Sequence, residues 1–351
     1  MLDLKLFETI FEDAAKEGIF SKAVAGFALP NGKTQVLAFH TEEDSVFDIA
    51  SLTKVCPTST IALKFILENR LGLDNLVKDY IPELHTNYRD EILVRHLLTH
   101  SLDYRVPMKT LIALPPQGIL DSLFNYQFAA RPGTIFNYGN PASILLGLIL
   151  QRISGKNLLE LGTELLFEPL GMARSGYDPL TRVSKDEIVA TEFCKWRGRE
   201  ICGEIHDESA FVLRELFPVG SAGMFSCVPD LLKFLQTLLN DGEYGGKRIL
   251  PAGILKMISE NALDGTAGHS NVPGECTALG FELNATKFMG TRHSAHTFGK
   301  TGFTGASIVG DAERKAGVVL LSNFTYPHRE PNADRIHAFR ARLADLFFES
   351  L

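Results

Sequence analysis

Ser51 and Lys54 stand three residues apart, and this pair could carry out nucleophilic chemistry. On a helix the two side chains would lie on one face, within reach of each other. A serine hydroxyl is a poor nucleophile unless a neighbouring base takes its proton, and a lysine whose pKa is depressed by burial can be that base. Alone the pattern is weak, because Ser-x-x-Lys is expected about once by chance in a chain of this size. Ser51 could also simply cap the helix.

Tyr138-Gly139-Asn140 is a second candidate, and no other of the eight tyrosines has an asparagine two residues later. A phenol beside two lysines can ionise below its usual pKa of about 10 and act as a general base. The amide of Asn140 offers both a donor and an acceptor to a substrate amide. The alternative interpretation is a turn before the helix that follows Pro141, with Asn140 as the cap of that helix.

Lys300-Thr301-Gly302 is the third candidate, within the glycine-rich residues 298–305. A glycine in a strand lets another backbone or a ligand approach closely. A lysine and a hydroxyl that project from such an edge suit the recognition of a carboxylate. The alternative is an ordinary edge strand that a lysine protects from aggregation.

Two predicted hairpins supply the strands that must position these motifs. Residues 23–29 and 34–40 are apolar runs on either side of an Asn-Gly pair, which is a strong local hairpin signal. Residues 306–309 and 317–321 flank a charged turn and predict a second hairpin near the other end of the chain.

Helical patterns occupy both ends of the chain and its middle. Amphipathic helices are predicted around residues 7–14 and over 333–349, and helical patterns dominate from about residue 51 to 170. This order indicates an α+β fold, in which an antiparallel sheet is flanked by terminal helices and carries an inserted all-helical region. The expected division is 1–70 for the first part of the α/β region, 71–205 for the helical region and 206–351 for the second part of the α/β region.

The composition is that of an ordinary globular protein, with 45% hydrophobic and 22% charged residues, so the chain can bury a sizeable core. The formal net charge is −7 and no basic tract stands out, so neither nucleic acid nor an anionic membrane is an expected partner. No apolar run approaches the roughly 20 residues of a membrane-spanning helix. Phosphate-binding glycine loops are absent, and we expect no cofactor. These patterns do not specify an oligomeric state.

The five cysteines are odd in number and scattered, which does not favour a disulfide framework and suits a reducing compartment. The first residues lack the basic and then apolar pattern of a secretory leader. Together these features predict a cytoplasmic protein, or a periplasmic one if a leader has been removed. Cys56 is expected to be a buried packing residue and not a nucleophile, because the helical period turns it away from Ser51.

Two other candidate sites are not favoured. His96 and His100 are spaced i, i+4 on a predicted helix, a spacing that can bind zinc, but the glutamate of His-Glu-x-x-His is missing. His206-Asp207 would suit a Ser-His-Asp triad, but the chain has no Gly-x-Ser-x-Gly elbow. We therefore expect neither a metal site nor such a triad.

The three motifs each occur once, and they follow one another in the order of one known arrangement. With them the sequence resembles the serine β-lactamase and penicillin-binding protein superfamily, which is marked by Ser-x-x-Lys and Lys-Thr-Gly. Tyr-x-Asn as the middle motif resembles the class C β-lactamase and esterase branch. Further segments that agree with the resemblance are residues 94–101, 167–172 and 220–226.

The resemblance implies a role for each motif residue. Ser51 would be the acylated nucleophile, and Lys54 and Tyr138 would share the proton transfers. Lys300 would keep the pKa of the tyrosine low and bind the acid group of a substrate. The backbone N–H groups of Ser51 and Phe303 would form an oxyanion hole, in which the loss of one donor typically costs about 10² to 10³ in rate.

Asn140, Thr301 and Gly302 would bind the substrate, with Asn140 against its acyl side chain. The sequence departs from the family pattern at Asp103, since relatives usually have a glycine after the Thr-His-Ser-Leu stretch. That loop borders the site, so the resemblance does not carry over the shape of the accepted substrate.

We therefore expect a serine hydrolase that works through an acyl-enzyme on small esters or amides. Esterase-type activity is favoured, with weak β-lactam hydrolysis beside it, and the partner is then a small-molecule ester, amide or β-lactam. A true β-lactamase, or a D-amino-acid peptidase or carboxypeptidase, is the first alternative. The second is a non-hydrolytic penicillin-binding or sensor protein that is acylated without turnover.

Overall fold

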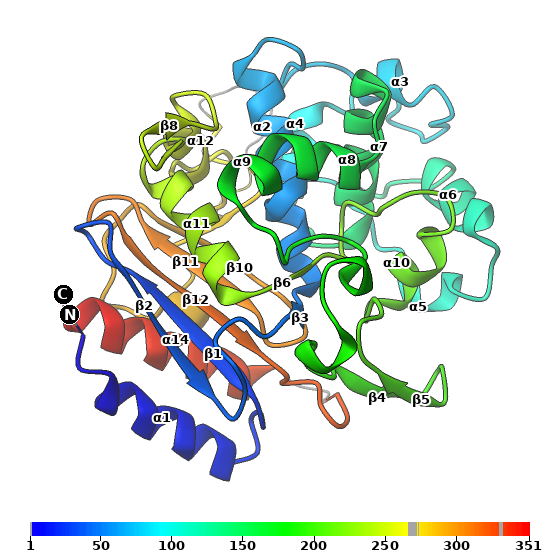
Figure 1. Cartoon of the computed structure of the whole chain (residues 1–351). Helices are drawn as coiled ribbons and strands as arrows, with labels where there is room; N and C mark the ends of the chain where they lie inside the picture. The colour runs from blue at the N-terminus through cyan, green and yellow to red at the C-terminus, as the bar shows by residue number, and fades with distance from the viewer. Residues whose placement is uncertain (1, 266–271, 273, 330–332) are drawn as a thin grey trace.

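A six-stranded antiparallel sheet lies between two layers of helices (Figure 1). The structure is a computed structural model and describes residues 2–265, 272, 274–329 and 333–351. The strand order is β2-β1-β12-β11-β10-β9, and all neighbouring strands pair antiparallel. The strands are β1 (Ala23–Ala28), β2 (Thr34–Phe39), β9 (Glu282–Leu283), β10 (Thr297–Thr301), β11 (Ser307–Asp311) and β12 (Ala316–Ser322).

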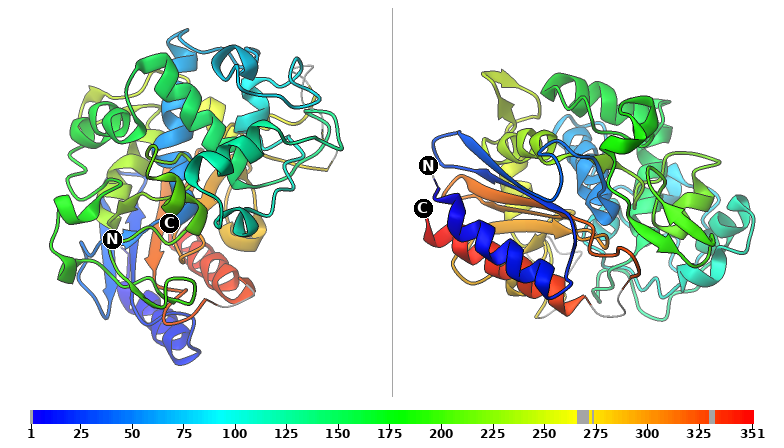
Figure 2. Two further views of the ribbon diagram at one scale, coloured as in Figure 1. Left: turned by 90° about the vertical axis from the view of Figure 1, so that its right-hand side faces the viewer. Right: turned by 60° about the horizontal axis from the view of Figure 1, so that its bottom comes forward.

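The two ends of the chain form a helical layer on one face of this sheet. Helices α1 (Leu4–Lys16) and α14 (Asp334–Glu349) lie side by side there, as Figure 1 and the right-hand view of Figure 2 show. Aromatic side chains join the two helices, with the ring centroids of Phe11 and Phe339 5.2 Å apart. The apolar residues that recur along α1 are all buried, as its amphipathic pattern predicts: Phe7, Ile10, Phe11 and Ala14.

The opposite face of the sheet packs against α11 (Val228–Leu239). Gly26, in the middle of β1, makes this contact close, because a Cβ there would lie 2.4 Å from a methyl group of Val228 and 2.8 Å from one of Leu232. Helices on both faces explain why every residue of β1 is buried. The sheet is therefore the wall between two hydrophobic cores.

Most of the helices lie on the α11 side of the sheet (Figure 2, left). The α-helices are α2 (Thr60–Leu67), α3 (Val77–Tyr80), α4 (Val94–Leu98), α5 (Met108–Leu111), α6 (Pro116–Phe124), α7 (Asn140–Ser154), α8 (Leu158–Gly162), α9 (Glu168–Leu170), α10 (Glu208–Leu213), α12 (Ile254–Ser259) and, beside the sheet, α13 (Thr286–Met289). The 3₁₀ and π segments are η1 (Ala50–Lys54), η2 (Val55–Ser59), η3 (Thr163–Phe167), η4 (Pro179–Thr181) and η5 (Lys185–Glu187). Short ribbons pair β3 (Phe47–Asp48) with β6 (Phe225–Ser226), β4 (Glu192–Cys194) with β5 (Arg199–Ile201), and β7 (Glu243–Tyr244) with β8 (Lys247–Arg248).

The predicted α+β class is confirmed, since terminal helices cover an antiparallel sheet and helices fill the middle of the chain. Both predicted hairpins are present, as β1–β2 and β11–β12. The ribbon β4–β5 was not predicted, because its three-residue strands are too short to show a period, so the inserted region is not helical throughout. The division at residues 70 and 205 stays a prediction. Helices make contacts across both boundaries, since α2 packs on α7 and α10 packs on α5 and α6.

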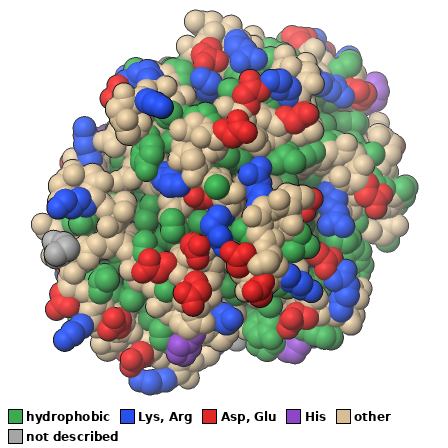
Figure 3. Space-filling view, in the orientation of Figure 1, with side chains coloured by type: hydrophobic (Ala, Val, Ile, Leu, Met, Phe, Trp, Pro, Cys, Tyr) green, Lys and Arg blue, Asp and Glu red, His purple; other side chains and the backbone are tan. Residues whose placement is uncertain are grey.

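Acidic and basic side chains are interspersed over the face of the molecule that Figure 3 shows, as the moderate net charge suggests. Within the described residues, no helix has the length and apolar character needed to span a membrane. All five cysteines lie in the described part and are free thiols. The predicted compartment stays a prediction.

Arg340 on α14 connects the outer helical layer to the loop that follows β10. The side chain is buried, and its guanidinium donates hydrogen bonds to the backbone oxygens of Gly302 (2.8 Å) and Ala306 (2.9 Å). A hydrogen bond from a charged donor is worth about 1.5–3 kcal/mol. Arg340 therefore holds the loop that begins at Gly302, the last residue of the third motif.

We predict that Arg340→Leu lowers the free energy of unfolding by about 2–4 kcal/mol, because two buried backbone oxygens lose a charged donor. Urea denaturation measures the loss. Arg342→Leu on the same helix is the matched control: this side chain is 57% exposed and lies 3.8 Å from Asp13, so a change within about 0.5 kcal/mol is expected. Equal losses in the two variants would contradict the role given to Arg340.

Candidate active site

The segment that carries Ser51 and Lys54 is helical but irregular. It begins as the 3₁₀ helix η1, passes through the π segment η2 and continues as the α-helix α2. The helical pattern predicted from about residue 51 is therefore present, but the helix it forms is interrupted. Cys56 has non-helical backbone angles, and Pro57 has no N–H to donate. The two motif side chains still share a face, since Lys54 Nζ lies 3.0 Å from Ser51 Oγ.

Ala50, directly before Ser51, has a φ of 46°, which is uncommon for a residue other than glycine. Strain of this kind occurs at functional sites and persists only when the surroundings support it. Asp48 gives that support, because its buried carboxylate accepts hydrogen bonds of 2.7 Å from the N–H groups of Ala50 and His206. Its backbone oxygen also accepts a hydrogen bond of 2.7 Å from Thr304 Oγ1. The backbone around Ser51 is thus fixed from two sides.

The ammonium of Lys54 is buried and surrounded by acceptors. Besides Ser51 Oγ, it donates to Asn140 Oδ1 and to the backbone oxygen of Ser221, each at 2.9 Å. Burial lowers the pKa of Lys54 below that of a free lysine. Lys54 therefore gives up a proton more readily than a surface lysine, as a base beside a serine must.

Tyr138 lies between two lysines. Its ring centroid is 4.1 Å from Lys300 Nζ and 5.2 Å from Lys54 Nζ, and its hydroxyl interacts with Ser51. Burial of the hydroxyl alone would raise the pKa of Tyr138, but the positive charges of Lys54 and Lys300 outweigh it and hold the pKa below its ordinary value. The residue as a whole is 45% exposed, so a substrate can reach it.

Lys300 lies on β10, which is paired on both sides, and is 2% exposed. The alternative interpretation as a solvent-exposed edge lysine is therefore wrong. Its Nζ is 3.3 Å from one carboxylate oxygen of Glu282, and Lys287 Nζ is 2.9 Å from the other. Burial opposes ionisation of Glu282, but these two lysines hold its pKa below the ordinary value. Lys300 is thus a buried cation whose charge is partly balanced.

Asn140 is the first residue of α7, and both ends of its amide are engaged. Oδ1 accepts from Lys54, while Nδ2 donates to Asp207 Oδ2 at 2.9 Å and lies 3.5 Å from Ser209 Oγ. The N-cap position of α7 is Gly139, which makes no side-chain hydrogen bond. The interpretation of Asn140 as a helix cap is therefore wrong, and its side chain belongs to the cluster around Lys54.

The loop after β10 lies directly against the nucleophile segment. A Cβ at Gly302 would lie 2.4 Å from the backbone oxygen of Ile49, so only glycine fits there. In the part of the chain that the structure describes, the N–H groups of Ser51 and Phe303 make no hydrogen bond. Free N–H donors beside a nucleophile are the kind of group that stabilises a developing oxyanion. Thr301, the last residue of β10, is half-buried.

His100 is buried against Tyr138, with 4.9 Å between the ring centroids. It follows the end of α4 and has a φ of 53°, so it does not share a helix face with His96. The predicted i, i+4 placement of the two histidines is wrong for this reason. Burial keeps the pKa of His100 well below its ordinary value. Among the described residues, no group of three or more histidine, cysteine or acidic side chains could hold a metal ion.

A cavity of about 530 Å³ opens beside the motif residues. It is lined by residues 104–109, Ile112, 137–141 and 207–209. The volume is in the range of small-molecule sites. Asp103, where the sequence departs from the family pattern, is buried and pairs with Arg105 at 2.5 Å, so this departure orients an arginine at the cavity.

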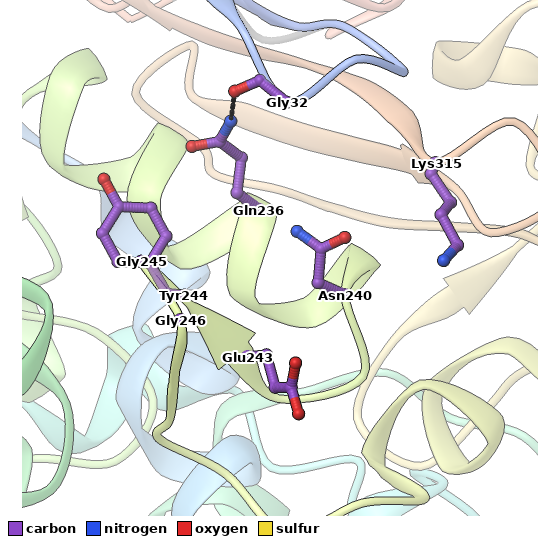
Figure 4. A pocket seen from close by; sticks show the side chains of 8 residues that line it. All are labelled: Gly32, Gln236, Asn240, Glu243, Tyr244, Gly245, Gly246 and Lys315. Atoms are coloured by element: carbon purple, nitrogen blue, oxygen red, sulfur yellow. Dashed lines mark hydrogen bonds between the residues drawn. The ribbon is translucent and has the colours of Figure 1, made fainter.

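A second cavity, of about 550 Å³, lies between the β1–β2 turn, the end of α11, the β7–β8 ribbon and the β11–β12 turn (Figure 4). Gln236 Nε2 donates to the backbone oxygen of Gly32 across it, at 2.7 Å. Its lining residues are Gly32, Gln236, Asn240, Glu243, Tyr244, Gly245, Gly246 and Lys315. None of them belongs to the three motifs, so the first cavity is the candidate active site.

The structure brings the side chains of the three motifs into one cluster, although they come from distant parts of the chain. Further residues of the cluster were not predicted. Glu282 and Asp48 have no local sequence pattern that marks them. Asp207 was considered only as a triad member, and the structure pairs His206 with Glu192 at 2.5 Å instead. A capping pattern at the start of α10 could have drawn attention to Asp207, whose side chain accepts from the N–H of Ala210.

Comparison with known proteins agrees with the family resemblance of the sequence. The family model described as Beta-lactamase matches residues 11–343. A protein of Escherichia coli (strain K12), named "Putative D-alanyl-D-alanine carboxypeptidase", is 29% identical over 324 residues, which cover 82% of this chain and 72% of that protein.

Two solved structures have a similar fold. One is EstCE1, a hydrolase with promiscuous acyltransferase activity, with a TM-score of 0.71 and 21% identity over 95% of this chain and 97% of that chain. The other is a beta-lactamase/D-alanine carboxypeptidase from Pseudomonas syringae, with a TM-score of 0.69 and 20% identity over 96% and 98%. At these identities the likeness supports the fold alone. Because the family model spans almost the whole chain and the fold agrees with it, the chain belongs to the beta-lactamase family, as its three motifs predict.

Proposed function

We propose that this chain is a serine hydrolase that forms an acyl-enzyme on Ser51 and then hydrolyses it. The observation that carries the proposal is the 3.0 Å contact between Lys54 Nζ and Ser51 Oγ, inside a site where Tyr138 also lies. A nucleophile held against a base is the arrangement that covalent catalysis requires. The substrates are small esters or amides.

Tyr138 and Lys54 share the proton transfers in this mechanism. As the Ser51 hydroxyl attacks the acyl carbonyl, the Tyr138 oxygen accepts its proton and then passes a proton to the leaving group. Lys54 and Lys300 stabilise the phenolate form of Tyr138. In the second half of the reaction, water attacks the acyl carbonyl, the same base accepts its proton, and that proton passes to Ser51 Oγ as the ester bond breaks. The apparent pKa values of this site belong to the coupled groups and not to one residue.

The N–H groups of Ser51 and Phe303 bind the oxyanion. Both are free of other hydrogen bonds in the described part of the chain, and each such donor is worth about 10² to 10³ in rate. The tight contact of Gly302 with Ile49 supports this role, because it holds the two backbone segments together.

The acyl group of the substrate occupies the cavity of about 530 Å³, against Asn140. The oxygen of the Asn140 amide is used by Lys54, and its nitrogen donates to Asp207 and, at 3.5 Å, to Ser209 Oγ. A substrate carbonyl would take the N–H that now makes the long contact with Ser209. Thr301 and Gly302, at the end of β10, bind the substrate on the opposite side.

Esters are favoured over substrates with a free carboxylate. Lys300 is already paired with Glu282, and a balanced cation attracts an anion less strongly than a free one. The site is also open, since Tyr138 and Phe303 are each nearly half exposed. Weak β-lactam hydrolysis is expected beside ester hydrolysis.

A carboxypeptidase acting on D-alanyl peptides, or a true β-lactamase, is the second candidate. It is favoured by the name of the Escherichia coli relative and by the lysine and hydroxyl that Lys300 and Thr301 offer to a carboxylate. A non-hydrolytic penicillin-binding or sensor protein is the third, in which the acyl-enzyme would form but persist.

We predict that p-nitrophenyl acetate and butyrate are hydrolysed faster than nitrocefin or a D-alanyl-D-alanine peptide, because Lys300 is already paired. Ser51→Ala should lower kcat/KM for the esters at least about a thousandfold, since the nucleophile carries the largest share of such a mechanism. Steady-state kinetics on this panel measures both. Fastest turnover of the peptide would establish the carboxypeptidase instead, and a penicillin adduct that persists for hours without ester turnover would establish the sensor.

A fluorophosphonate probe provides the control for the nucleophile. Intact-mass measurement should show one adduct on the wild type and on Ser122→Ala, a serine on α6 outside the site, and none on Ser51→Ala. Full labelling of Ser51→Ala would show that the nucleophile has been assigned to the wrong residue.

We predict that Tyr138 is the first tyrosine to ionise as the pH rises. Two lysines hold its pKa below the ordinary value, whereas burial raises the pKa of Tyr104 and Tyr177. Ultraviolet absorbance of tyrosinate, followed during a pH titration, should show an early step that disappears in Tyr138→Phe and remains in Tyr326→Phe. An early step that survives in Tyr138→Phe would refute the lowered pKa and with it the role of Tyr138 as base.

A further inference from the structure

Asp207 is the outer end of a chain of hydrogen bonds that reaches the nucleophile. Its Oδ2 accepts from Asn140 Nδ2 at 2.9 Å, Asn140 Oδ1 accepts from Lys54 Nζ at 2.9 Å, and Lys54 Nζ lies 3.0 Å from Ser51 Oγ. The residue is half-buried, and among the described residues the hydrogen bonds of its carboxylate go to Asn140, Ser209 and Ala210, not to Ser51 or Lys54. Its influence on the reaction therefore passes through Asn140 and through its charge.

The orientation of the Asn140 amide decides whether this chain works. An asparagine amide has an acceptor at one end and donors at the other, and the two ends have nearly the same shape. Lys54 is a donor only, so it needs the oxygen end. A carboxylate at Asp207 accepts only, and it therefore selects the orientation in which the nitrogen of Asn140 points away from Lys54.

A second set of contacts holds the Asp207 carboxylate itself in place. Its Oδ1 accepts from Ser209 Oγ at 2.6 Å and from the N–H of Ala210 at 2.8 Å, as the N-cap of α10. The two oxygens thus have separate tasks: Oδ1 anchors the side chain to a helix, and Oδ2 orients Asn140. A residue needed only as a cap would leave Oδ2 to solvent.

We propose that Asp207 is a positioning residue, which orients the amide of Asn140 and places a negative charge behind Lys54. This inference rests on the proposed Ser51 mechanism and adds to it a residue outside the three motifs. Asp207 touches neither Ser51 nor the reacting atoms. It sets the position of Lys54 and the balance between its charged and neutral forms.

The electrostatic setting gives the direction of the expected effect. Burial opposes the ionisation of Asp207, but its hydrogen bonds with Ser209 and Ala210 and the nearby Lys54 hold its pKa below the ordinary value, so it is charged at neutral pH. That charge raises the pKa of Lys54, against the larger effect of burial. The other ionisable groups around this cluster are Tyr138, Lys300, Glu282, Asp48 and His100.

The test is the pH dependence of acylation in Asp207→Asn. Asparagine is as good an N-cap as aspartate, so α10 should remain intact, while the charge is lost and Asn140 is free to turn. The second-order rate constant of fluorophosphonate labelling should fall at its plateau by about 10- to 100-fold, as expected for a displaced catalytic group. The acid limb of the pH profile, over which the rate rises with pH, should move to lower pH by roughly half to one unit. This is less than the shift of about 1–3 pKa units that a charge in direct contact produces.

The sign follows from the state of the base. Acylation needs the Lys54–Tyr138 pair to be able to accept a proton, so the acid limb reports its apparent pKa. Removing a negative charge makes the protonated pair less stable and lowers that pKa. A loss of structure alone would lower the rate at every pH and leave the limb where it was.

Ser209→Ala is the matched comparison, because it removes the contacts of Ser209 Oγ with Asp207 Oδ1 and with Asn140 Nδ2 but keeps the charge of Asp207 and its bond to Asn140. The plateau of this variant is not the readout; its acid limb should stay in place. If Asp207→Asn does not fold, Asp207→Ser, another good N-cap without the charge, should show the same shift. An unmoved acid limb in the folded variant overturns the proposal, whether the plateau falls or not. If Ser51→Ala is still labelled, the proposed function is overturned. If Ser51→Ala is not labelled but the rate and pH dependence of labelling in Asp207→Asn equal those of the wild type, this inference alone is overturned.

Discussion

The buried ammonium of Lys54 is the interaction on which the rest of the site depends. Taking a charge out of water costs several kcal/mol unless protein groups replace the lost hydration. Lys54 has acceptors on Ser51, Asn140 and Ser221, and they come from segments that are far apart in the sequence. These hydrogen bonds hold the charged side chain in place. Burial nevertheless lowers the pKa of Lys54, because it makes the charged form less stable than it is in water. A proton-transfer group needs this balance.

The sheet supplies the second cation of the site. Lys300 comes from β10, and Tyr138 lies between it and Lys54. The loop after β10 is tied to the outer helix α14 by Arg340 and to the nucleophile segment by Thr304. The C-terminal helix therefore helps to set the distance between the two lysines. This explains why the site needs α14 although none of the motif residues lies on it.

Local patterns predicted most of the framework. The helix around residues 7–14 shows its buried face in the spacing of its apolar residues, and the first hairpin is marked by its Asn-Gly turn. The contacts that tune the site have no such mark, because Glu282 is 18 residues from Lys300 and Asp207 is 67 residues from Asn140. The irregular backbone at Cys56 and the positive φ of Ala50 also could not be predicted from the sequence. Both depend on support from other segments of the chain and not on the local conformational propensity of these residues.

The central claim is that catalysis passes through an ester of Ser51. The most direct test is peptide mapping by mass spectrometry of the protein quenched in acid during turnover of a p-nitrophenyl ester. The account predicts an acyl mass on the peptide that contains Ser51, located on that residue by fragmentation. An acyl group on another residue, such as the neighbouring Cys56, or turnover with no covalent intermediate when acylation is faster than deacylation, would contradict it.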